Sequence, residues 1–307
     1  MTRSSARVLL GAVVLLATAT AHGQDLGHRL HGTLGIDAGR VSEPGLYVID
    51  KFVLYSSTQV RDQQGHAIPG HFDLRGVADA IGLGITLKLD VIGAYYSAAA
   101  AYPFVWVNLK SDRLAATVDR SGVADISVQP IKLGWRTGRL DVVTAYSLLV
   151  PTSRAGVVGS PLARTQLTHE LDLGGTVFFD RARRWRLSAL ASYFLNQSKW
   201  DVDATRGDLI AVQGGAAVRL WRVLDLGIAG YGAWQVRDHR GADVPPELKG
   251  IRERSYGLGP EIAVFIPVLR LRIDARYERE FLIEARPEGQ IVVVTASFIA
   301  WRPRTKR

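Results

Sequence analysis

The hydrophobic and polar residues of positions 268–281 alternate more regularly than those of any other stretch of the chain. One parity is mostly charged and consists of Val268, Arg270, Arg272, Asp274, Arg276, Glu278 and Glu280. The other parity is apolar except for Arg279 and contains Leu269, Leu271, Ile273, Ala275, Tyr277 and Phe281. Because successive side chains of a β-strand point to opposite faces, this stretch predicts one long strand with a charged face and an apolar face.

Comparable long runs recur along most of the chain. Ordinary strands have about five or six residues, and every one of these runs is longer. They predict strands at residues 45–57, 72–89, 92–109, 122–137, 139–152, 166–181, 184–200, 207–221, 223–238, 252–266, 268–282 and 289–301.

The connections between these runs differ in length in a regular way. From the fourth run onward, tight joints such as 137–138 and 221–222 alternate with long ones such as 153–165 and 239–251. Short turns at one end and longer loops at the other are typical of transmembrane β-barrels, and an even strand count lets the sheet close without leaving an edge in hydrocarbon. We therefore predict an all-β fold, a transmembrane up-and-down antiparallel β-barrel of about twelve strands.

The N-terminal residues have the pattern of a secretory signal peptide. Arg3 and Arg7 precede an apolar run over 8–17, and small residues follow it. That run is too short to span a bilayer as a helix, which needs about 20 residues, so we expect cleavage after Ala21 or Gly23. The expected division of the chain is a signal peptide (1–23), an N-terminal segment that is disordered or inserted into the lumen (24–43), the barrel (44–301) and a basic tail (302–307).

The composition excludes several other classes of protein. The sequence contains no cysteine, so disulfides and thiolate metal sites are impossible. The formal net charge is +9, but the basic residues are scattered along the strands and mixed with acidic ones. Because export also removes the protein from nucleic acid, we expect no nucleic-acid partner.

The charged parity is expected to face the inside of the barrel, because a charge on the lipid face near the bilayer centre costs about 2–4 kcal/mol. Two interpretations of this lining remain open: a surface that selects solutes, or a structural network of ion pairs between neighbouring strands. In the second case Glu253 and Glu261 are the expected partners of the arginines, and Leu269, Leu271, Ile273, Ala275 and Tyr277 are expected to face lipid. The candidate lumen-lining residues are Glu170, Asp172, Arg186, Glu253, Glu261, Arg270, Arg272, Asp274, Arg276, Glu278 and Glu280.

Motifs for catalysis are missing from the sequence. The seven histidines show neither an HExxH pattern nor another metal-ligand spacing, and no G-x-S-x-G motif occurs. We therefore expect no catalytic residues, no metal and no cofactor, and we expect the protein not to be an enzyme.

Several short segments together resemble the meta-pathway of phenol degradation family of outer-membrane β-barrel proteins. Their order and spacing carry the resemblance across about 250 residues. The matching positions are 122–125, Pro130, 133–135, 151–152, 170–174, Tyr193, Asn196, 207–208, 230–231, 235–236, Asp238, 257–260, 277–281 and Gly289. The resemblance implies a transporter-like barrel linked to the catabolism of aromatic or hydrophobic compounds, and it supplies no established catalytic residues.

The chain departs from the family pattern in two places. Ser153 replaces the usual glycine, and 154–164 replace an Asn-rich loop, so solute specificity cannot be carried over. Barrels also usually end on an aromatic residue read by the barrel-assembly machinery, whereas here Trp301 is followed by a basic tail.

These observations predict a channel or facilitator in the bacterial outer membrane for small organic solutes, including aromatic or hydrophobic compounds used in catabolism. The expected partners are outer-membrane lipid, a small organic solute and the barrel-assembly machinery. A barrel enzyme acting on lipids and a structural envelope barrel are the alternatives.

Overall fold

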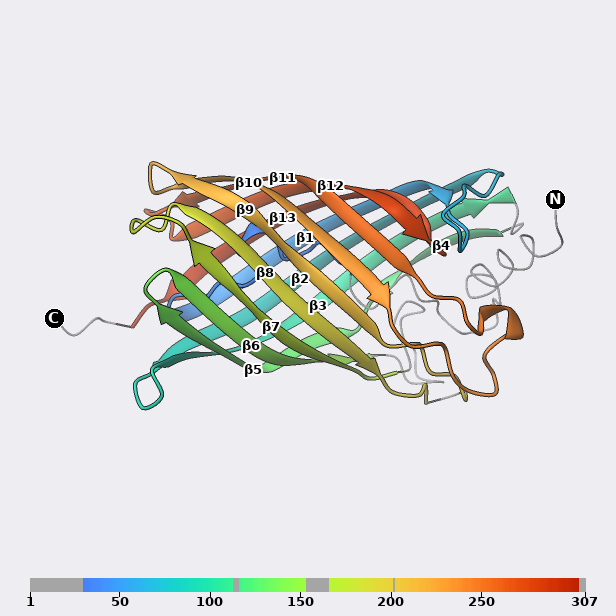
Figure 1. Ribbon diagram of the computed structural model, residues 1–307, viewed down its shortest axis with the longest axis horizontal. Helices are drawn as coiled ribbons and strands as arrows, with labels where there is room; N and C mark the ends of the chain where they lie inside the picture. The colour runs from blue at the N-terminus through green and yellow to red at the C-terminus, as the bar shows by residue number, and fades with distance from the viewer. Residues whose placement is uncertain (1–29, 113–115, 153–165, 201, 304–307) are drawn as a thin grey trace.

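The computed structural model describes residues 30–112, 116–152, 166–200 and 202–303, which form one antiparallel β-barrel (Figure 1). Thirteen strands follow one another in a single sheet, and the pairing of β2 with β3 closes it. The strands are β1 (Gly45–Val60), β2 (Phe72–Leu89), β3 (Ala94–Ser111), β4 (Ala116–Val123), β5 (Ile126–Thr137), β6 (Leu140–Val150), β7 (Thr168–Phe178), β8 (Trp185–Asn196), β9 (Leu209–Leu220), β10 (Leu224–Gln235), β11 (Arg254–Ile266), β12 (Leu271–Glu284) and β13 (Pro287–Trp301).

The barrel has twelve strand positions because β4 and β5 occupy one of them in succession. β4 pairs with the Phe104–Ser111 half of β3, and β5 pairs with the half that begins at Tyr95. The all-β barrel with twelve strand positions predicted from the sequence is therefore confirmed. The strands predicted at 92–109 and 122–137 leave 110–121 as a loop; this is wrong, because 116–121 belong to β4.

Short turns connect the strands at one end of the barrel, on the left of Figure 1. The connections at the other end are longer, except for the two residues 285–286 between β12 and β13. We call the two ends the turn end and the loop end. One turn differs from the expectation: β12 begins at Leu271, not at 268, and residues 267–270 form a four-residue turn. Pro267 has no backbone N–H to donate to a sheet, and Arg270 has a positive φ of 52° that suits a turn rather than a strand.

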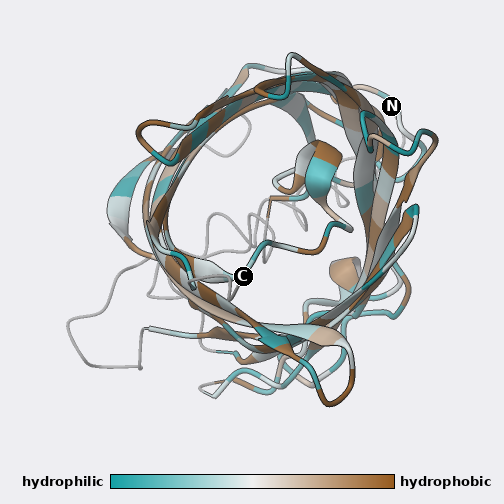
Figure 2. Cartoon of the chain, turned by 90° about the vertical axis from the view of Figure 1, so that its left-hand side faces the viewer, coloured by the Kyte–Doolittle hydropathy of each residue, from teal (hydrophilic) through white to brown (hydrophobic). Residues whose placement is uncertain are grey.

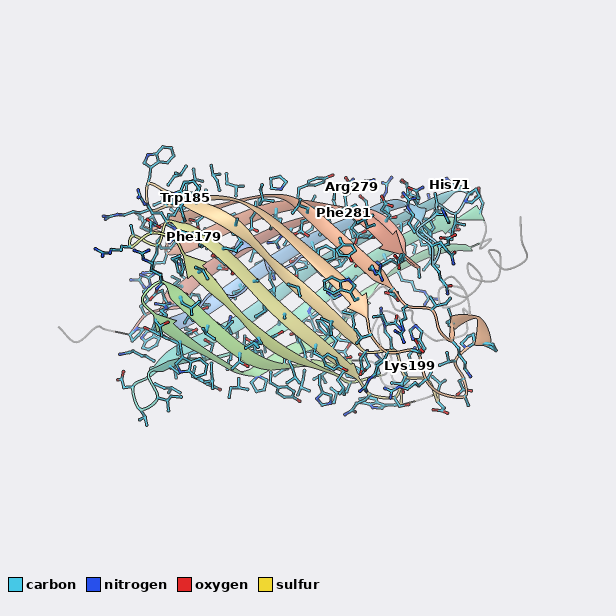
Figure 3. The ribbon with its side chains drawn as sticks, in the orientation of Figure 1. His71, Phe179, Trp185, Lys199, Arg279 and Phe281 are labelled. Carbon is cyan, nitrogen blue, oxygen red and sulfur yellow. The ribbon has the colours of Figure 1, made fainter. Side chains whose placement is uncertain are left out.

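The outer surface of the barrel is apolar. Ile81, Leu171, Leu173, Ile228 and Leu258 each expose more than half of their surface, and Figure 3 shows side chains such as Trp185 and Phe281 projecting outward from the wall. Exposed and buried residues alternate along the strands, for example along β8. This is the pattern of a barrel wall whose outer face contacts lipid. Among the described residues, no helix is long and apolar enough to cross a membrane.

The segment before β1 runs inside the barrel, as the view along the barrel axis shows (Figure 2). Residues 30–44, here called the plug, include the short 3-10 helix η1 (Gly35–Asp37), which contacts β8, β9 and β10. Ile36 is completely buried between Ala217 and Ala229. Gly39 has to be glycine, because a Cβ there would overlap the backbone carbonyl oxygens of the facing strands β7 and β8.

The signal peptide and most of the basic tail expected from the sequence, and the loop 154–164 that departs from the family pattern, lie outside the described residues.

Candidate functional site

The lumen consists of two chemically different halves. In the loop-end half, inward-facing apolar side chains from β1–β3, β8–β10 and β13 form one buried cluster. We call this the apolar half. Its members are Val53, Tyr55, Val60, Phe72, Leu74, Val107, Leu109, Phe194, Leu209, Ala211, Tyr231, Ala233, Ile291 and Val293. Since the interior of outer-membrane barrels is generally polar, this cluster is a specific feature of the molecule.

The plug meets the apolar half at His31. The imidazole ring lies 5.8 Å from the ring of Phe194 and 5.9 Å from the ring of Tyr231, measured between ring centroids. Only 6% of His31 is exposed. Three aromatic rings therefore stand together at the boundary between the apolar half and the plug.

A carboxylate fixes the tyrosines of the apolar half in place. The hydroxyl groups of Tyr231 and Tyr55 donate hydrogen bonds to Glu280 over 2.6 and 2.9 Å, and the backbone N–H of Gly289 donates a third over 2.7 Å. Arg286 lies 3.6 Å from the same carboxylate. Glu280 therefore orients two aromatic rings and is itself balanced by a cation.

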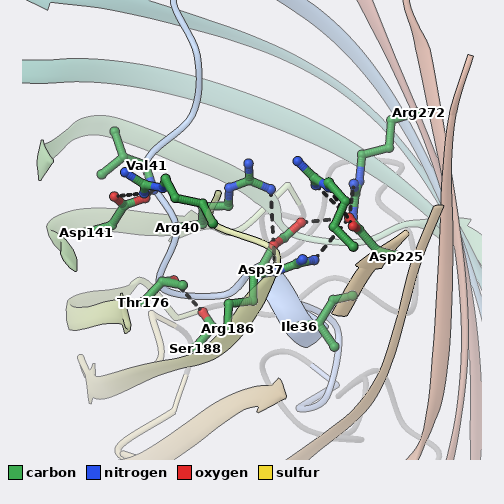
Figure 4. Close-up of polar contacts among 12 residues, drawn as sticks. Ile36, Asp37, Arg40, Val41, Asp141, Thr176, Arg186, Ser188, Asp225 and Arg272 are labelled. Atoms are coloured by element: carbon green, nitrogen blue, oxygen red, sulfur yellow. Dashed lines mark hydrogen bonds and ion pairs between the residues drawn. The ribbon is translucent and has the colours of Figure 1, made fainter. Parts of the chain in front are cut away.

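In the turn-end half, four arginines surround two aspartates (Figure 4). Asp37 of η1 accepts from Arg186 Nε over 3.0 Å and from Arg272 Nη2 over 2.9 Å, and Arg40 Nη1 lies 3.5 Å away.

The second aspartate, Asp225 on β10, belongs to the barrel wall. It accepts two hydrogen bonds of 2.7 Å from Arg219 and one of 2.9 Å from Arg272. Arg186 Nη2 lies 3.1 Å from the same carboxylate. Arg186 and Arg272 therefore bridge the plug to the wall.

Wall side chains also bind the backbone of the plug. The N–H groups of Ile36 and Gly39 donate to Glu261 Oε2 over 2.9 Å and to Ser188 Oγ over 2.8 Å, and the N–H of Val41 donates to Asp141 over 3.3 Å. Because these contacts use the backbone, they fix the path of the plug whatever its side chains are.

The structure brings most of the candidate lining residues into the lumen. Buried, inward-facing positions are occupied by Glu170, Asp172, Arg186, Glu261, Arg276, Glu278 and Glu280, and partly buried ones by Arg272 and Asp274. Of the two acidic partners expected for the arginines, Glu261 contacts Arg276 over 2.9 Å, whereas Glu253 binds Arg206 of the β8–β9 loop over 3.0 Å.

Three residues of the first alternating run, 268–270, lie outside the strand. Arg270, expected in the lumen, and Leu269, expected to face lipid, are both exposed in the β11–β12 turn. The reason is the later start of β12. Within the strand, Ile273 and Tyr277 are exposed on the outer face by 38% and 39%.

Sequence reasoning missed two groups of charged residues. The first group consists of the two aspartates Asp37 and Asp225. Asp37 was missed because a three-residue 3-10 helix has no periodicity to read. Asp225 was detectable, because it alternates with Leu224, Leu226 and Ile228 on the run predicted for 223–238.

The second missed group contradicts the rule that charged strand residues face inward. Asp50 of β1 and Asp79 of β2 share the outer face with exposed Val48, Phe52 and Ile81. Asp50 pairs across the strands with Ile81, and Asp79 pairs with Phe52. The two carboxyl groups are therefore diagonal neighbours within hydrogen-bonding reach of each other.

Comparison with solved structures gives the same fold. The COG4313 outer membrane channel from Pseudomonas putida F1 is 12% identical, with a TM-score of 0.74, over 85% of this chain and 97% of that one. The β domain of the Bordetella autotransporter BrkA matches with 12% identity and a TM-score of 0.51, over 84% of this chain and 100% of that one. The transport unit of the autotransporter AIDA-I from Escherichia coli matches with 9% identity and a TM-score of 0.51, over 93% and 95% of the two chains.

The fold is therefore that of a bacterial outer-membrane β-barrel. No curated protein matches the sequence significantly. Residues 57–295 match a protein family described as "Putative MetA-pathway of phenol degradation". This match covers most of the barrel and agrees with the resemblance drawn from the sequence. The chain belongs to this family.

Proposed function

We propose that the protein is an outer-membrane channel or facilitator for small organic solutes that carry an aromatic or hydrophobic part. The observation that supports this most strongly is the apolar half of the lumen, with Phe194 and Tyr231 as its aromatic side chains next to the plug. Pockets that bind small organic molecules are lined mainly by apolar and aromatic side chains with a few placed polar groups. A channel for sugars or ions has no need of such a lining.

The family and the P. putida channel support the same proposal. The family description refers to phenol degradation, and the P. putida protein is named an outer membrane channel. Phenol combines an aromatic ring with a polar group, and the lumen offers an apolar half followed by a polar half. A solute of this kind therefore matches the lumen in the order of its apolar and polar parts.

The plug limits how a solute can pass along the lumen. Residues 30–44 fill the turn-end half and bind the wall through Glu261, Ser188 and Asp141. A solute that enters from the loop end therefore reaches the plug after the apolar half. Passage along the lumen requires these contacts to rearrange.

Uptake into proteoliposomes tests the proposal. The purified barrel should admit phenol and toluene faster than protein-free liposomes do, and it should show no comparable gain for glucose or arabinose. Phe194→Asp places a charge in the apolar half and should reduce aromatic uptake, whereas Phe298→Asn on the outer face of β13 should leave it unchanged.

Two results would contradict the proposal. Equal gains for sugars and aromatic solutes would indicate a general porin. Release of fatty acids from the liposome lipid, without solute uptake, would support the rival function of a lipid-acting barrel enzyme.

A further inference from the structure

We propose that Arg186 and Arg272 form a binding site for the carboxylate of a small organic acid, and that Asp37 of the plug occupies this site until the solute displaces it. The inference rests on the proposed function and adds monocarboxylic acids with a small apolar or aromatic body to its solutes. Arg219 and Asp225 hold the two arginines in position from the wall side.

The charges of the wall make this site attractive to an anion. Three wall arginines, Arg186, Arg219 and Arg272, face one wall aspartate, Asp225. Asp274 is the next carboxylate along β12, but it also faces Arg276 and Lys51. Asp37 is thus the group that brings a further negative charge to Arg186 and Arg272, and it comes from the plug.

Arg186 is incompletely satisfied by Asp37. Its side chain is 1% exposed, yet neither Nη1 nor Nη2 makes a hydrogen bond with another described residue, although Nη2 lies 3.1 Å from Asp225 Oδ2. Asp37 uses only the Nε side. Arginine binds carboxylates best through two parallel N–H···O bonds. A carboxylate that is not tied to η1 can turn to bind Nε and a terminal nitrogen together, which gives it an advantage over Asp37.

Asp37 and Arg272 are the more accessible partners of these ion pairs. Their side chains are 25% and 23% exposed, compared with 1% for Arg186 and 1% for Asp225. Ion pairs that reach solvent are weak and exchange readily, while buried ones are costly to break. A solute anion can therefore compete for Asp37's position without first separating the wall arginines from Asp225.

The residue beside Asp37 indicates the rest of the ligand. Ile36 is buried against Ala217 and Ala229, and a Cβ added to Gly215 or Gly227 would meet the Ile36 side chain. Small wall residues therefore create room for an apolar group directly next to the arginines. The Ile36–Asp37 pair has the chemical outline of a small organic acid, an apolar body with a carboxylate, and a ring of similar size can take its place.

Binding measurements in detergent test the site separately from transport. Benzoate, benzyl alcohol and benzamide are the probes, since the last two keep the ring and lack the charge. Wild type should bind benzoate more tightly than either neutral probe. Arg272→Gln should weaken benzoate binding about ten-fold or more, the effect of losing one charge-assisted hydrogen bond, and should leave benzyl alcohol binding unchanged.

Two further variants sharpen the measurement. Asp37→Asn removes the competing charge and should strengthen benzoate binding several-fold, an effect that a merely structural Asp37 would not produce. Arg206→Gln is the matched control, because it removes another buried arginine, which pairs with Glu253 at the loop end, and should leave benzoate binding as in wild type. Heat-modifiable migration on gels checks that each variant is folded.

The outcomes separate the inference from the proposed function. Equal weakening of benzoate and benzyl alcohol by Arg272→Gln, or unchanged benzoate binding in Asp37→Asn, overturns the carboxylate site. Uptake of neutral aromatic solutes without benzoate binding also overturns it and leaves the channel function standing. Benzoate binding with no uptake of any probe overturns the channel function and supports the site.

Discussion

The two halves of the lumen are occupied by different parts of the chain. The apolar half is lined by side chains of the wall itself, whereas the plug runs through the turn-end half and binds its wall. Wall side chains such as Phe194 and Leu209 are covalently fixed to paired strands. At its C-terminal side the plug continues into β1, and its other described attachments are hydrogen bonds and ion pairs. The turn-end half can therefore rearrange without unfolding of the barrel, whereas the apolar half cannot.

Loss of the buried ion pairs of Arg276 with Glu261 and Glu278 should reduce the stability of the barrel more than any of the substitutions that follow. Arg276→Met leaves two buried carboxylates, Glu261 and Glu278, without the cation that now lies 2.9 and 3.2 Å from them. Breaking a buried ion pair costs about 3–5 kcal/mol, and we expect a loss of that size in urea unfolding from lipid vesicles.

The matched control for this change is Arg254→Met, which breaks the exposed outer pair with Glu284. Exposed ion pairs contribute about 0–1 kcal/mol. Equal losses for the two variants would show that the inner network is no more important to stability than an outer one.

Displacing the plug should change conductance more than stability. Gly39→Val places a side chain against the backbone carbonyl oxygens of Gly175 and Ala189, so the plug can no longer follow its path. We expect single-channel conductance several-fold above wild type in planar bilayers. Gly76→Ala, whose added methyl group meets its nearest neighbour at 3.9 Å, should conduct like wild type, and an unchanged conductance in both variants would mean that the plug does not limit ion flow.

Sequence patterns identified the wall far better than the plug. Strand periodicity survives folding, and the structure has Arg272, Arg276 and Glu278 of β12 on the inner side of the wall. Arg270 lies elsewhere than expected, because the alternation in the sequence continues through the turn 267–270, where strand pairing has ended. Nothing in the sequence around Asp37 indicates its partners in the wall, which come from strands 149 and 235 residues away.

A further prediction concerns the carboxyl pair on the lipid-facing surface of the wall. Asp50 and Asp79 place two acids among lipid-facing side chains. Replacing both with leucine should stabilise the barrel by about 1–2 kcal/mol, since a charge on the lipid face is destabilising in a depth-dependent way. Urea unfolding in vesicles measures this, and a loss of stability in the double variant would mean that the pair has a favourable partner in the membrane.

The smallest effect is expected outside both halves, in the β7–β8 turn. The side chain of Arg184 and the backbone N–H of Trp185 donate hydrogen bonds to Asp180 and lower its pKa to about 2. Because the folded pKa lies below the usual aspartate value of 3.8, the contribution of Asp180 is present above that value and is lost as the pH falls through about 2. The melting temperature of Asp180→Asn should therefore be slightly below that of wild type at pH 7, and the difference should shrink as the pH falls through about 2. A difference independent of pH would contradict this assignment.

Photolabelling tests most directly whether the apolar half is the solute site. A neutral aryl diazirine applied to the barrel in vesicles should label residues of β8, β9 and β10 that face the lumen, with Phe194, Ala211 and Tyr231 at the centre. Excess phenol should reduce that labelling. Labelling confined to lipid-facing residues such as Ile228 and Leu258, and insensitive to phenol, would contradict the account.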